Sequence, residues 1–364
     1  METFNRADGM NYAPIGKASP VVKEGEYYFA AVALDHGHIY GMCNGLIEAG
    51  ATLKWVFDAD AEKVAQFQKT YPQVKAASSL EQILNDSDIQ LVAAAAIPNL
   101  RAELGITVMQ AGKHYFTDKG PFTTLEQLQQ VREVYEQTKR KYAVYYSERI
   151  HVESAVYAAQ LIQQGAIGRL VQMIGLGPHR LNASSRPDWF FRKEQYGGII
   201  ADIASHQIEQ FLYFSGNSNA QIVSSAVANF NNKEYPELED FGEVHLRGDD
   251  GATGYIRVDW FTPDGLRTWG DGRIVLLGTD GYIELRKYVN IATDGGTDHV
   301  FLVNGEKEQH IQATGLTGFP YFGQLILDTI HGTETSMTQE HIFTVAELTL
   351  RAQQQAVVLE GQKK

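Results

Sequence analysis

Two side chains four residues apart, Asp202 and His206, could carry out acid–base chemistry. They lie in the stretch GGIIADIASH at 197–206, where a helix would begin after the two glycines. On a helix this spacing places the carboxylate and the imidazole on the same face. An imidazole titrates near neutral pH and can accept a hydroxyl proton, while a carboxylate one turn away orients it. The stretch therefore indicates a catalytic pair, with a buried structural hydrogen bond as the alternative.

Metal binding is a further alternative for this spacing, because two ligands on one helical face can share an ion. His179 could serve as a third ligand, but no complete set of ligands stands out in the sequence. We therefore predict that the protein holds no metal.

A lysine in the stretch TDKGP at 117–121 could also act on a substrate. Lys119 follows a predicted strand at 114–117, and ligands of doubly wound folds bind at the carboxyl ends of the strands. Its ammonium could hydrogen-bond a reacting oxygen or a neighbouring hydroxyl, and could transfer a proton. The alternative is an ordinary surface lysine at the end of a strand.

The turn after the first predicted strand has a reduced glycine motif, ALDHGHIYG at 33–41. A dinucleotide fold typically carries G-x-G-x-x-G here, so that the backbone can approach a pyrophosphate at a helix N-terminus. Only Gly37 and Gly41 are present, and no register restores all three glycines. Alone the motif is weak evidence, and a plain strand-to-helix turn capped by Asp35 is the alternative.

Asp58 strengthens the dinucleotide interpretation. It ends the second predicted strand, about 20 residues beyond the glycine turn, where a carboxylate can accept both hydroxyls of a ribose. A carboxylate at this position would repel a 2′-phosphate, so it favours NAD(H) over NADP(H). A helix cap before Ala61 is the competing explanation.

Four aromatic or basic side chains precede the stretch at 197–206 and could bind a carbohydrate. Aromatic faces and forked guanidinium donors suit sugar rings and their hydroxyls. The same side chains could equally pack a domain interface. The four candidates are His179, Arg180, Trp189 and Arg192.

Strands and helices alternate through the first half of the chain. Strands are predicted at 28–34, 52–57, 74–77, 89–96, 114–117 and 142–146. Helices are predicted between them at 38–49, 61–70, 80–84, 100–111 and 125–138. The alternation indicates an α/β domain with a doubly wound parallel sheet at 28–146, after an N-terminal arm at 1–27.

The second half has a different pattern. Helices are predicted at 152–164, 200–214 and 342–359, and strands at 170–176, 221–230, 242–247, 251–261, 272–278, 281–287 and 299–303. Short turns between the later strands indicate a mainly antiparallel sheet. We therefore predict a substrate domain of the α+β class with a large open sheet at 147–364. A homo-oligomer, either a dimer or a tetramer, could cover the open face of that sheet.

The composition argues against several classes of protein. The 364 residues include 31 Lys plus Arg and 44 Asp plus Glu, which gives a formal charge of −13. An acidic chain without a clustered basic stripe is a poor candidate for nucleic-acid binding. No apolar run approaches the roughly 20 residues that span a bilayer. We predict a partner that is a small molecule, with no nucleic acid and no membrane.

The expected compartment is the cytoplasm. The single cysteine, Cys43, allows no internal disulfide, which fits a reducing compartment. The arm at 1–27 lacks the apolar core of a signal peptide.

Taken together, these residues resemble the Gfo/Idh/MocA family of glucose–fructose oxidoreductases and inositol dehydrogenases, from about residue 28 to 359. The order and spacing of the lysine motif and the D-x-x-x-H motif make the resemblance specific. The matching stretches are AIPNLR at 96–101, KH at 113–114, DK at 118–119, GAIG at 165–168, GGIIADIASH at 197–206 and GTDG at 278–281.

The resemblance implies an N-terminal Rossmann domain that binds NAD(P), and a C-terminal α/β domain whose open sheet is used in oligomers. It implies that Lys119 is the catalytic lysine and that Asp202 and His206 are the catalytic pair on the substrate side. The cofactor contacts that it implies are Asp35, His36, Gly37, His38, Asp58, Ala96, Pro98, Asn99, Asp118 and Lys119.

The chain departs from the pattern of the family in three places. The glycine fingerprint is reduced to DHGH at 35–38, and Arg101 stands where a histidine is common. In the usual E-K-P motif, Gly120 replaces the proline, which moves to position 121. These departures affect the expected contacts with the cofactor, whereas the catalytic residues are retained.

The sequence therefore predicts an NAD(H)-dependent oxidoreductase that oxidises a ring secondary hydroxyl of a sugar, cyclitol or glycoside by hydride transfer. One alternative is a lyase, glycosidase or epimerase that keeps NAD bound and recycles it through a 3-oxo intermediate. A second alternative is a sensor that binds a dinucleotide or sugar without turnover, and the retained Lys119, Asp202 and His206 argue against it.

Overall fold

The computed structural model describes residues 9–17, 19–293 and 295–360. By their internal contacts these residues form two compact units. The parallel-sheet unit contains Met10–Tyr145 and Gly318–Phe343, and the mixed-sheet unit contains Gly9, Tyr146–Thr317 and 344–360. The domain limits of 28–146 and 147–364 stay a prediction.

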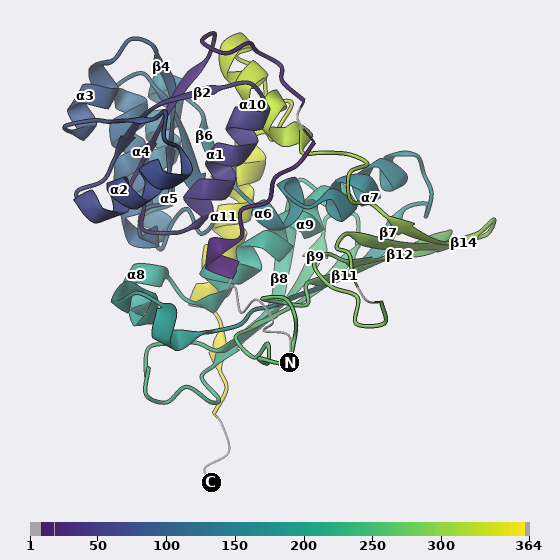
Figure 1. Cartoon of the computed structure of the whole chain (residues 1–364). Coiled ribbons are helices and arrows are strands. Elements are labelled where there is room, and N and C mark those ends of the chain that lie inside the picture. The colour runs from purple at the N-terminus through teal and green to yellow at the C-terminus, as the bar shows by residue number, and fades with distance from the viewer. Residues whose placement is uncertain (1–8, 18, 294, 361–364) are drawn as a thin grey trace. The chain divides into compact units, whose positions relative to one another are not determined.

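The parallel-sheet unit is built on six parallel strands in the order β3-β2-β1-β4-β5-β6. Strands β2, β4 and β6 of this sheet are labelled in Figure 1. Because the strand order reverses between β1 and β4, their carboxyl ends form a topological switch point, where ligands of such sheets bind. This confirms the predicted doubly wound sheet. The strands are β1 (Tyr28–Val32), β2 (Thr52–Phe57), β3 (Lys75–Ala76), β4 (Ile89–Ala94), β5 (His114–Asp118) and β6 (Tyr142–Tyr145).

Side-chain caps start several of the helices that connect these strands. Asp60 caps α2, Ser79 caps α3, and Thr124 forms a capping box with Gln127 at the start of α5. Helix α10, which the sequence analysis missed, contacts α1. The helices of the unit are α1 (His38–Glu48), α2 (Ala61–Thr70), α3 (Leu80–Asn85), α4 (Arg101–Gln110), α5 (Leu125–Thr138) and α10 (Pro320–His331).

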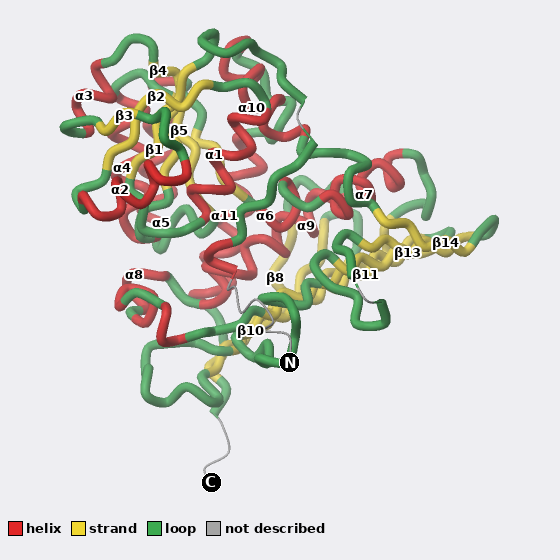
Figure 2. The backbone as a smooth tube through the Cα atoms, viewed as in Figure 1, coloured by secondary structure: helices red, strands yellow, loops and turns green. Residues whose placement is uncertain are grey.

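The mixed-sheet unit is built on nine strands in the order β14-β13-β12-β11-β7-β10-β9-β8-β15, drawn in yellow in Figure 2. The pairs β7–β10 and β8–β15 are parallel and the others are antiparallel, which confirms a mainly antiparallel sheet. The strands are β7 (Leu170–Pro178), β8 (Ala220–Ala228), β9 (Phe241–Gly248), β10 (Thr253–Asp259), β11 (Arg273–Gly278), β12 (Gly281–Arg286), β13 (His299–Asn304), β14 (Glu308–Gln312) and β15 (Val357–Val358).

Two predicted helices differ in the structure. The helix predicted at 200–214 begins with a π-helical segment, η5 (Ile200–Ala204), and continues as α9 (Ser205–Ser215). The terminal helix predicted to 359 ends earlier, as α11 (Gln339–Gln354), and β15 follows it because Val357 and Val358 pair with β8. The other helices are α6 (Ser147–Ile150), α7 (Glu153–Gln163) and α8 (Lys193–Tyr196).

Among the helices of the described residues, none is both long and apolar enough to cross a membrane.

One buried histidine in the parallel-sheet unit makes stability depend on pH. His114, at the start of β5, accepts a hydrogen bond at Nδ1 from the backbone N–H of Lys141, at 3.0 Å. Burial and the charges of Arg140 and Lys141 lower the pKa of His114 to about 4. Folding therefore holds this imidazole neutral at pH values where the unfolded chain protonates it.

We expect the His114→Asn variant to resist acid better than the parent protein. The parent should lose up to about 3 kcal/mol of unfolding free energy relative to the variant as pH falls from 7 to 4. Urea unfolding at several pH values measures this difference. Parallel stability curves for the two proteins would contradict the assignment.

Candidate functional site

The turn between β1 and α1 carries the reduced glycine motif. Ala33, directly after β1, has a left-handed φ of +52°, which is uncommon for a residue with a side chain and indicates a constrained turn. Gly37 is the N-cap of α1, and no side chain caps that helix. The predicted cap, Asp35, instead forms an ion pair with Lys63, at 2.6 Å.

A crevice of about 660 Å³ lies beside this turn. Leu34 and Gly37 line it from the turn, and Asp60, Lys63 and Lys69 line it from the start and body of α2. Its volume falls in the range of small-molecule sites, roughly 300–1,000 Å³. By its lining, the crevice lies beyond the carboxyl ends of β1 and β2, beside the start of α1.

Asp58, which follows β2 directly, is held by backbone hydrogen bonds. Its carboxylate accepts from the N–H of Leu34 at 2.6 Å and from the N–H of Asp60 at 2.8 Å. Asp60, and not Asp58, caps α2. Burial lowers the pKa of Lys63, but its bond to Asp35 and the charges of Asp58 and Asp60 together raise it above the usual value.

Asp118, the last residue of β5, is a fully buried carboxylate that His36, His38 and Arg101 surround. Its Oδ1 lies 2.8 Å from Nδ1 of His38, and its Oδ2 lies 3.3 Å from Nδ1 of His36. The Arg101 Nη2 also lies 3.3 Å from Oδ2. Burial alone would raise the pKa of Asp118, but His38, His36 and Arg101 hold it well below its usual value.

His36, His38 and Asp118 could also be metal ligands, because their ligand atoms lie within 4.8 Å of one another. However, Arg101 already neutralises the carboxylate, and the charge of Lys119 also acts on His36. A divalent cation would have to enter beside a guanidinium that already pairs with this carboxylate. The arrangement therefore favours hydrogen bonding over metal binding.

Lys119 follows Asp118 directly and is 6% exposed. Its backbone N–H donates to Asp118 Oδ1 at 2.7 Å. Of the other predicted cofactor residues, Ala96 and Pro98 are buried just after β4, and the carbonyl of Asn99 accepts from Gln127 Nε2 at 2.9 Å. The structure thus gathers the predicted cofactor residues at the carboxyl ends of β1, β2, β4 and β5.

In the mixed-sheet unit, Asp202 lies in η5 and His206 lies in the first turn of α9. The two side chains are 7% and 2% exposed. Gly197 and Gly198 both have left-handed φ values, and a Cβ on Gly198 would overlap the side chain of Gln353. The π-helical turn suits the functional interpretation, because such turns are frequent at functional sites.

Glu148, which the sequence analysis missed, is a buried carboxylate beside this pair. It accepts from Lys287 Nζ at 2.8 Å and from Gln207 Nε2 at 2.9 Å, and its Oε1 lies 3.9 Å from His179 Nε2. Burial raises the pKa of Glu148, but Lys287, His206 and His179 outweigh it and lower the pKa to about 2. Its position after the strand predicted at 142–146 is the signal that could have identified it.

The four predicted substrate residues have different surroundings. His179 is buried to about nine-tenths and packs against Trp260 and Trp269. Arg180 donates to the carbonyls of Pro263 at 3.1 Å and Leu266 at 2.7 Å. Trp189 is half-buried, and the exposed Arg192 lies 3.4 Å from Glu237. Only His179 is thereby placed beside Glu148, and the substrate roles stay predictions.

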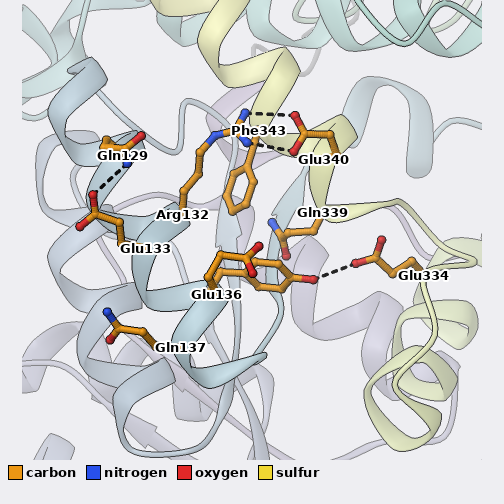
Figure 3. A pocket seen from close by; sticks show the side chains of 10 residues that line it. Gln129, Arg132, Glu133, Glu136, Gln137, Glu334, Gln339, Glu340 and Phe343 are labelled. Atoms are coloured by element: carbon orange, nitrogen blue, oxygen red, sulfur yellow. Dashed lines mark hydrogen bonds and ion pairs between the residues drawn. The ribbon is translucent and has the colours of Figure 1, made fainter.

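A second hollow in the parallel-sheet unit, of about 560 Å³, is lined by α5 and by side chains from 334–343. Figure 3 shows Arg132 over the ring of Phe343, with Glu340 on its guanidinium. None of the predicted site residues lines this hollow. We therefore place the candidate site at the crevice and at the buried clusters.

Two family models match the chain. Residues 36–146 match the model described as an oxidoreductase family with an NAD-binding Rossmann fold. Residues 155–284 match the model described as the GFO/IDH/MocA C-terminal domain.

Two curated relatives are sugar dehydrogenases by name. The chain is 24% identical over 213 residues to a D-xylose dehydrogenase of Paenarthrobacter nicotinovorans, which covers 54% of this chain and 55% of the relative. It is 28% identical over 212 residues to a levoglucosan dehydrogenase of Pseudarthrobacter phenanthrenivorans, which covers 57% and 53%. The chain thus spans about half the length of these curated relatives.

Solved structures extend the likeness over most of the chain. A putative oxidoreductase from Erwinia carotovora atroseptica is 51% identical, with a TM-score of 0.89 over 92% of this chain and 100% of that chain. A levoglucosan dehydrogenase in complex with NADH is 18% identical, with a TM-score of 0.73 over 89% and 95%, and shows a common fold.

The buried pair of Glu148 and Lys287 gives a prediction about stability. Lys287→Met would leave the carboxylate of Glu148 buried without its cation, so we expect unfolding free energy to fall by about 3–5 kcal/mol. The double variant Glu148→Gln, Lys287→Met should recover most of this loss. Urea unfolding measures the parent, the single variants Lys287→Met and Glu148→Gln, and the double variant. Losses of the two single variants that simply add in the double variant would contradict the pairing.

Proposed function

Because the chain belongs to the Gfo/Idh/MocA family of oxidoreductases, we propose that it reversibly oxidises a ring secondary hydroxyl of a sugar, cyclitol or glycoside. One observation carries this proposal. Lys119, Asp202 and His206 are each more than nine-tenths buried, and lysine and aspartate are rarely buried so deeply without a specific role.

The residues around the crevice fit a dinucleotide in most respects. The N-terminus of α1 and the volume of the crevice suit a pyrophosphate and an adenosine. A Cβ on Gly37 would lie 2.4 Å from the Met10 carbonyl and 2.9 Å from Asn11 Oδ1. Residues 10–11 therefore occupy the space that the missing side chain of Gly37 leaves open. A pyrophosphate bound at this turn would displace that segment. When bound, the nicotinamide supplies the hydride acceptor or donor.

The side chains of the protein would supply proton transfer and orientation. In oxidation, the imidazole of His206 would accept the proton of the substrate hydroxyl, with the carboxylate of Asp202 supporting its positive charge. The ammonium of Lys119 would donate a hydrogen bond to a substrate oxygen and stabilise negative charge that develops there. Glu148 would help to hold a protonated His206, since its charge is one of those that act on that imidazole.

We propose NAD(H) over NADP(H) as the cofactor. The carboxylates of Asp35, Asp58 and Asp60 act on Lys63, and they outnumber the two cations of this region, Lys63 and Lys69. A 2′-phosphate would therefore meet net negative charge. His179, Arg180, Trp189 and Arg192 remain our candidates for sugar contacts.

We also propose a cytoplasmic homo-oligomer, a dimer or a tetramer. Leu277 and Tyr282 pair across β11 and β12 and are 44% and 42% exposed, which suits a sheet face that a second copy covers. No observation among the described residues favours the lyase, glycosidase or epimerase alternative, which remains an outcome of the assay below.

We expect Lys119→Ala and His206→Ala each to lower kcat by about 10²–10⁴-fold, because each removes a proton-transfer or charge-stabilising group. The assay follows NADH absorbance with NAD⁺ and D-xylose or levoglucosan, the sugars named in the curated relatives, and then a panel of glycosides. Arg132→Met, in the hollow of Figure 3, is the control. Near-parental rates for both variants would remove the assignment, and glycoside cleavage without net NADH would favour the lyase class.

Cofactor choice gives a separate prediction. We expect the parent protein to bind NADH about tenfold or more tightly than NADPH, a difference of about 1.4 kcal/mol. Asp58→Asn keeps an acceptor for the N–H of Leu34 but removes the charge, so it should narrow this ratio. Fluorescence titration measures the four dissociation constants, with Glu81→Gln on α3 as the control. If Asp58→Asn left the ratio of the NADPH and NADH dissociation constants unchanged, Asp58 would not be the residue that recognises the ribose.

A further inference from the structure

The turn that carries Lys119 is held by an arginine that neither the family pattern nor the proposed chemistry assigns. We propose that Arg101 is a positioning residue, which fixes the turn after β5 so that the ammonium of Lys119 is presented in one orientation. This inference rests on the proposed function, because it concerns how Lys119 performs its role there.

The three guanidinium nitrogens of Arg101 donate hydrogen bonds to three backbone carbonyls and one carboxylate. Its Nε donates to the carbonyl of Ala96, just after β4, at 2.7 Å. Its Nη1 donates to the carbonyl of Lys119 and, at 3.2 Å, to that of Gly120. Its Nη2 donates to Asp118 Oδ2 at 3.3 Å. The side chain is 1% exposed, so these bonds are shielded from water and strengthened by the low local dielectric.

The carbonyls of Lys119 and Gly120 both point to the guanidinium because of the backbone conformation of Gly120. Its φ is +66°, a left-handed value that glycine adopts freely and that proline cannot adopt. The usual proline of the E-K-P motif would therefore turn the carbonyls away from Arg101. Arg101 and Gly120 are thus a matched pair of departures from the family pattern.

The reduced glycine motif takes part in the same cluster. His36 and His38, which stand in that motif, lie on the two oxygens of Asp118, and Asp118 in turn accepts from the N–H of Lys119. The His36 and His38 rings meet edge to face, with centroids 4.2 Å apart. Two of the three departures, the reduced glycine motif and Arg101, therefore meet at Asp118. The third, Gly120, joins them through its carbonyl, which accepts from Arg101.

A histidine at position 101 could not replace this arrangement. An imidazole has two ring nitrogens, whereas the guanidinium donates in a planar fork to four acceptors here. A lysine would keep the positive charge beside Asp118 but would lack the fork. The effect of Arg101 on Lys119 is therefore one of geometry as well as charge, and the two can be separated by substitution.

The first test compares Arg101→Lys and Arg101→Met with the parent protein, at a temperature where circular dichroism shows each to be folded. We expect both variants to lower kcat by about 10²-fold, because a displacement of about 1 Å at a reacting group has an effect of that size. The KM for NAD⁺ should stay near the parental value. A parental kcat in Arg101→Lys would show that charge alone matters and would overturn the proposal.

The second test needs no substrate. Lysines are acylated competitively with acetic anhydride, and mass spectrometry compares Lys119 with the exposed Lys75 of β3. We expect Lys119 to be acylated several-fold faster in both Arg101 variants, because its turn is no longer held. Unchanged acylation of Lys119 in the folded variants would overturn the proposal.

Backbone variants supply a check that does not depend on the arginine. Gly120→Ala opposes the left-handed φ, so we expect it to raise the acylation of Lys119 and lower kcat in the same direction. Gly112→Ala is the matched control, because Gly112 also has a left-handed φ, of +79°, and has open space around it. Equal effects of the two glycine variants would overturn the proposal.

The two tests also separate this inference from the proposed function. Faster acylation of Lys119 in the variants, together with no turnover of any sugar by the parent, would support the positioning role and reject the dehydrogenase. Turnover by the parent that the Arg101 variants retain in full would support the dehydrogenase and reject the positioning role.

Discussion

The buried carboxylate of Asp118 is the constraint on which the parallel-sheet unit depends. A charge removed from water must be paired and hydrogen-bonded, since an unpaired one would be too costly to keep ionised. The imidazole of His38, from the turn after β1, and the guanidinium of Arg101, from the start of α4, meet this need. The ring of His36 lies beside the same carboxylate, at 3.3 Å. One carboxylate therefore joins the ends of β1, β4 and β5, where the candidate chemistry lies.

The mixed-sheet unit also contains a buried carboxylate that must be paired, that of Glu148. Its partner Lys287 lies just after β12, and Gln207 lies in α9 next to His206. A single ionised carboxylate thereby fixes the helix that carries the proposed proton acceptor and also acts on its charge. In each unit a buried acid orders the polar side chains around it, so rigidity and electrostatics have the same origin.

Much of the fold could be predicted from local pattern. The strand at 52–57 and the helices at 61–70 and 125–138 have the predicted bounds, because apolar periodicity and capping residues mark them. Predictions from local pattern failed where pairing between residues far apart in the sequence decides the structure. Val357 and Val358 read as the end of a helix, but they form β15 against β8. The π-helical turn at Ile200–Ala204 likewise has no signature distinct from an α-helix.

For the candidate site, the sequence by itself determined which side chains could do chemistry: Lys119, Asp202 and His206 could be chosen from residue type, spacing and resemblance. It did not reveal Arg101 as more than a departure, or Glu148 at all. Their importance arises from burial and from partners up to 139 residues away, as in the bond from Lys287 to Glu148. Only the tertiary structure brings such groups together, because the need to neutralise a buried charge appears only once folding has removed the water.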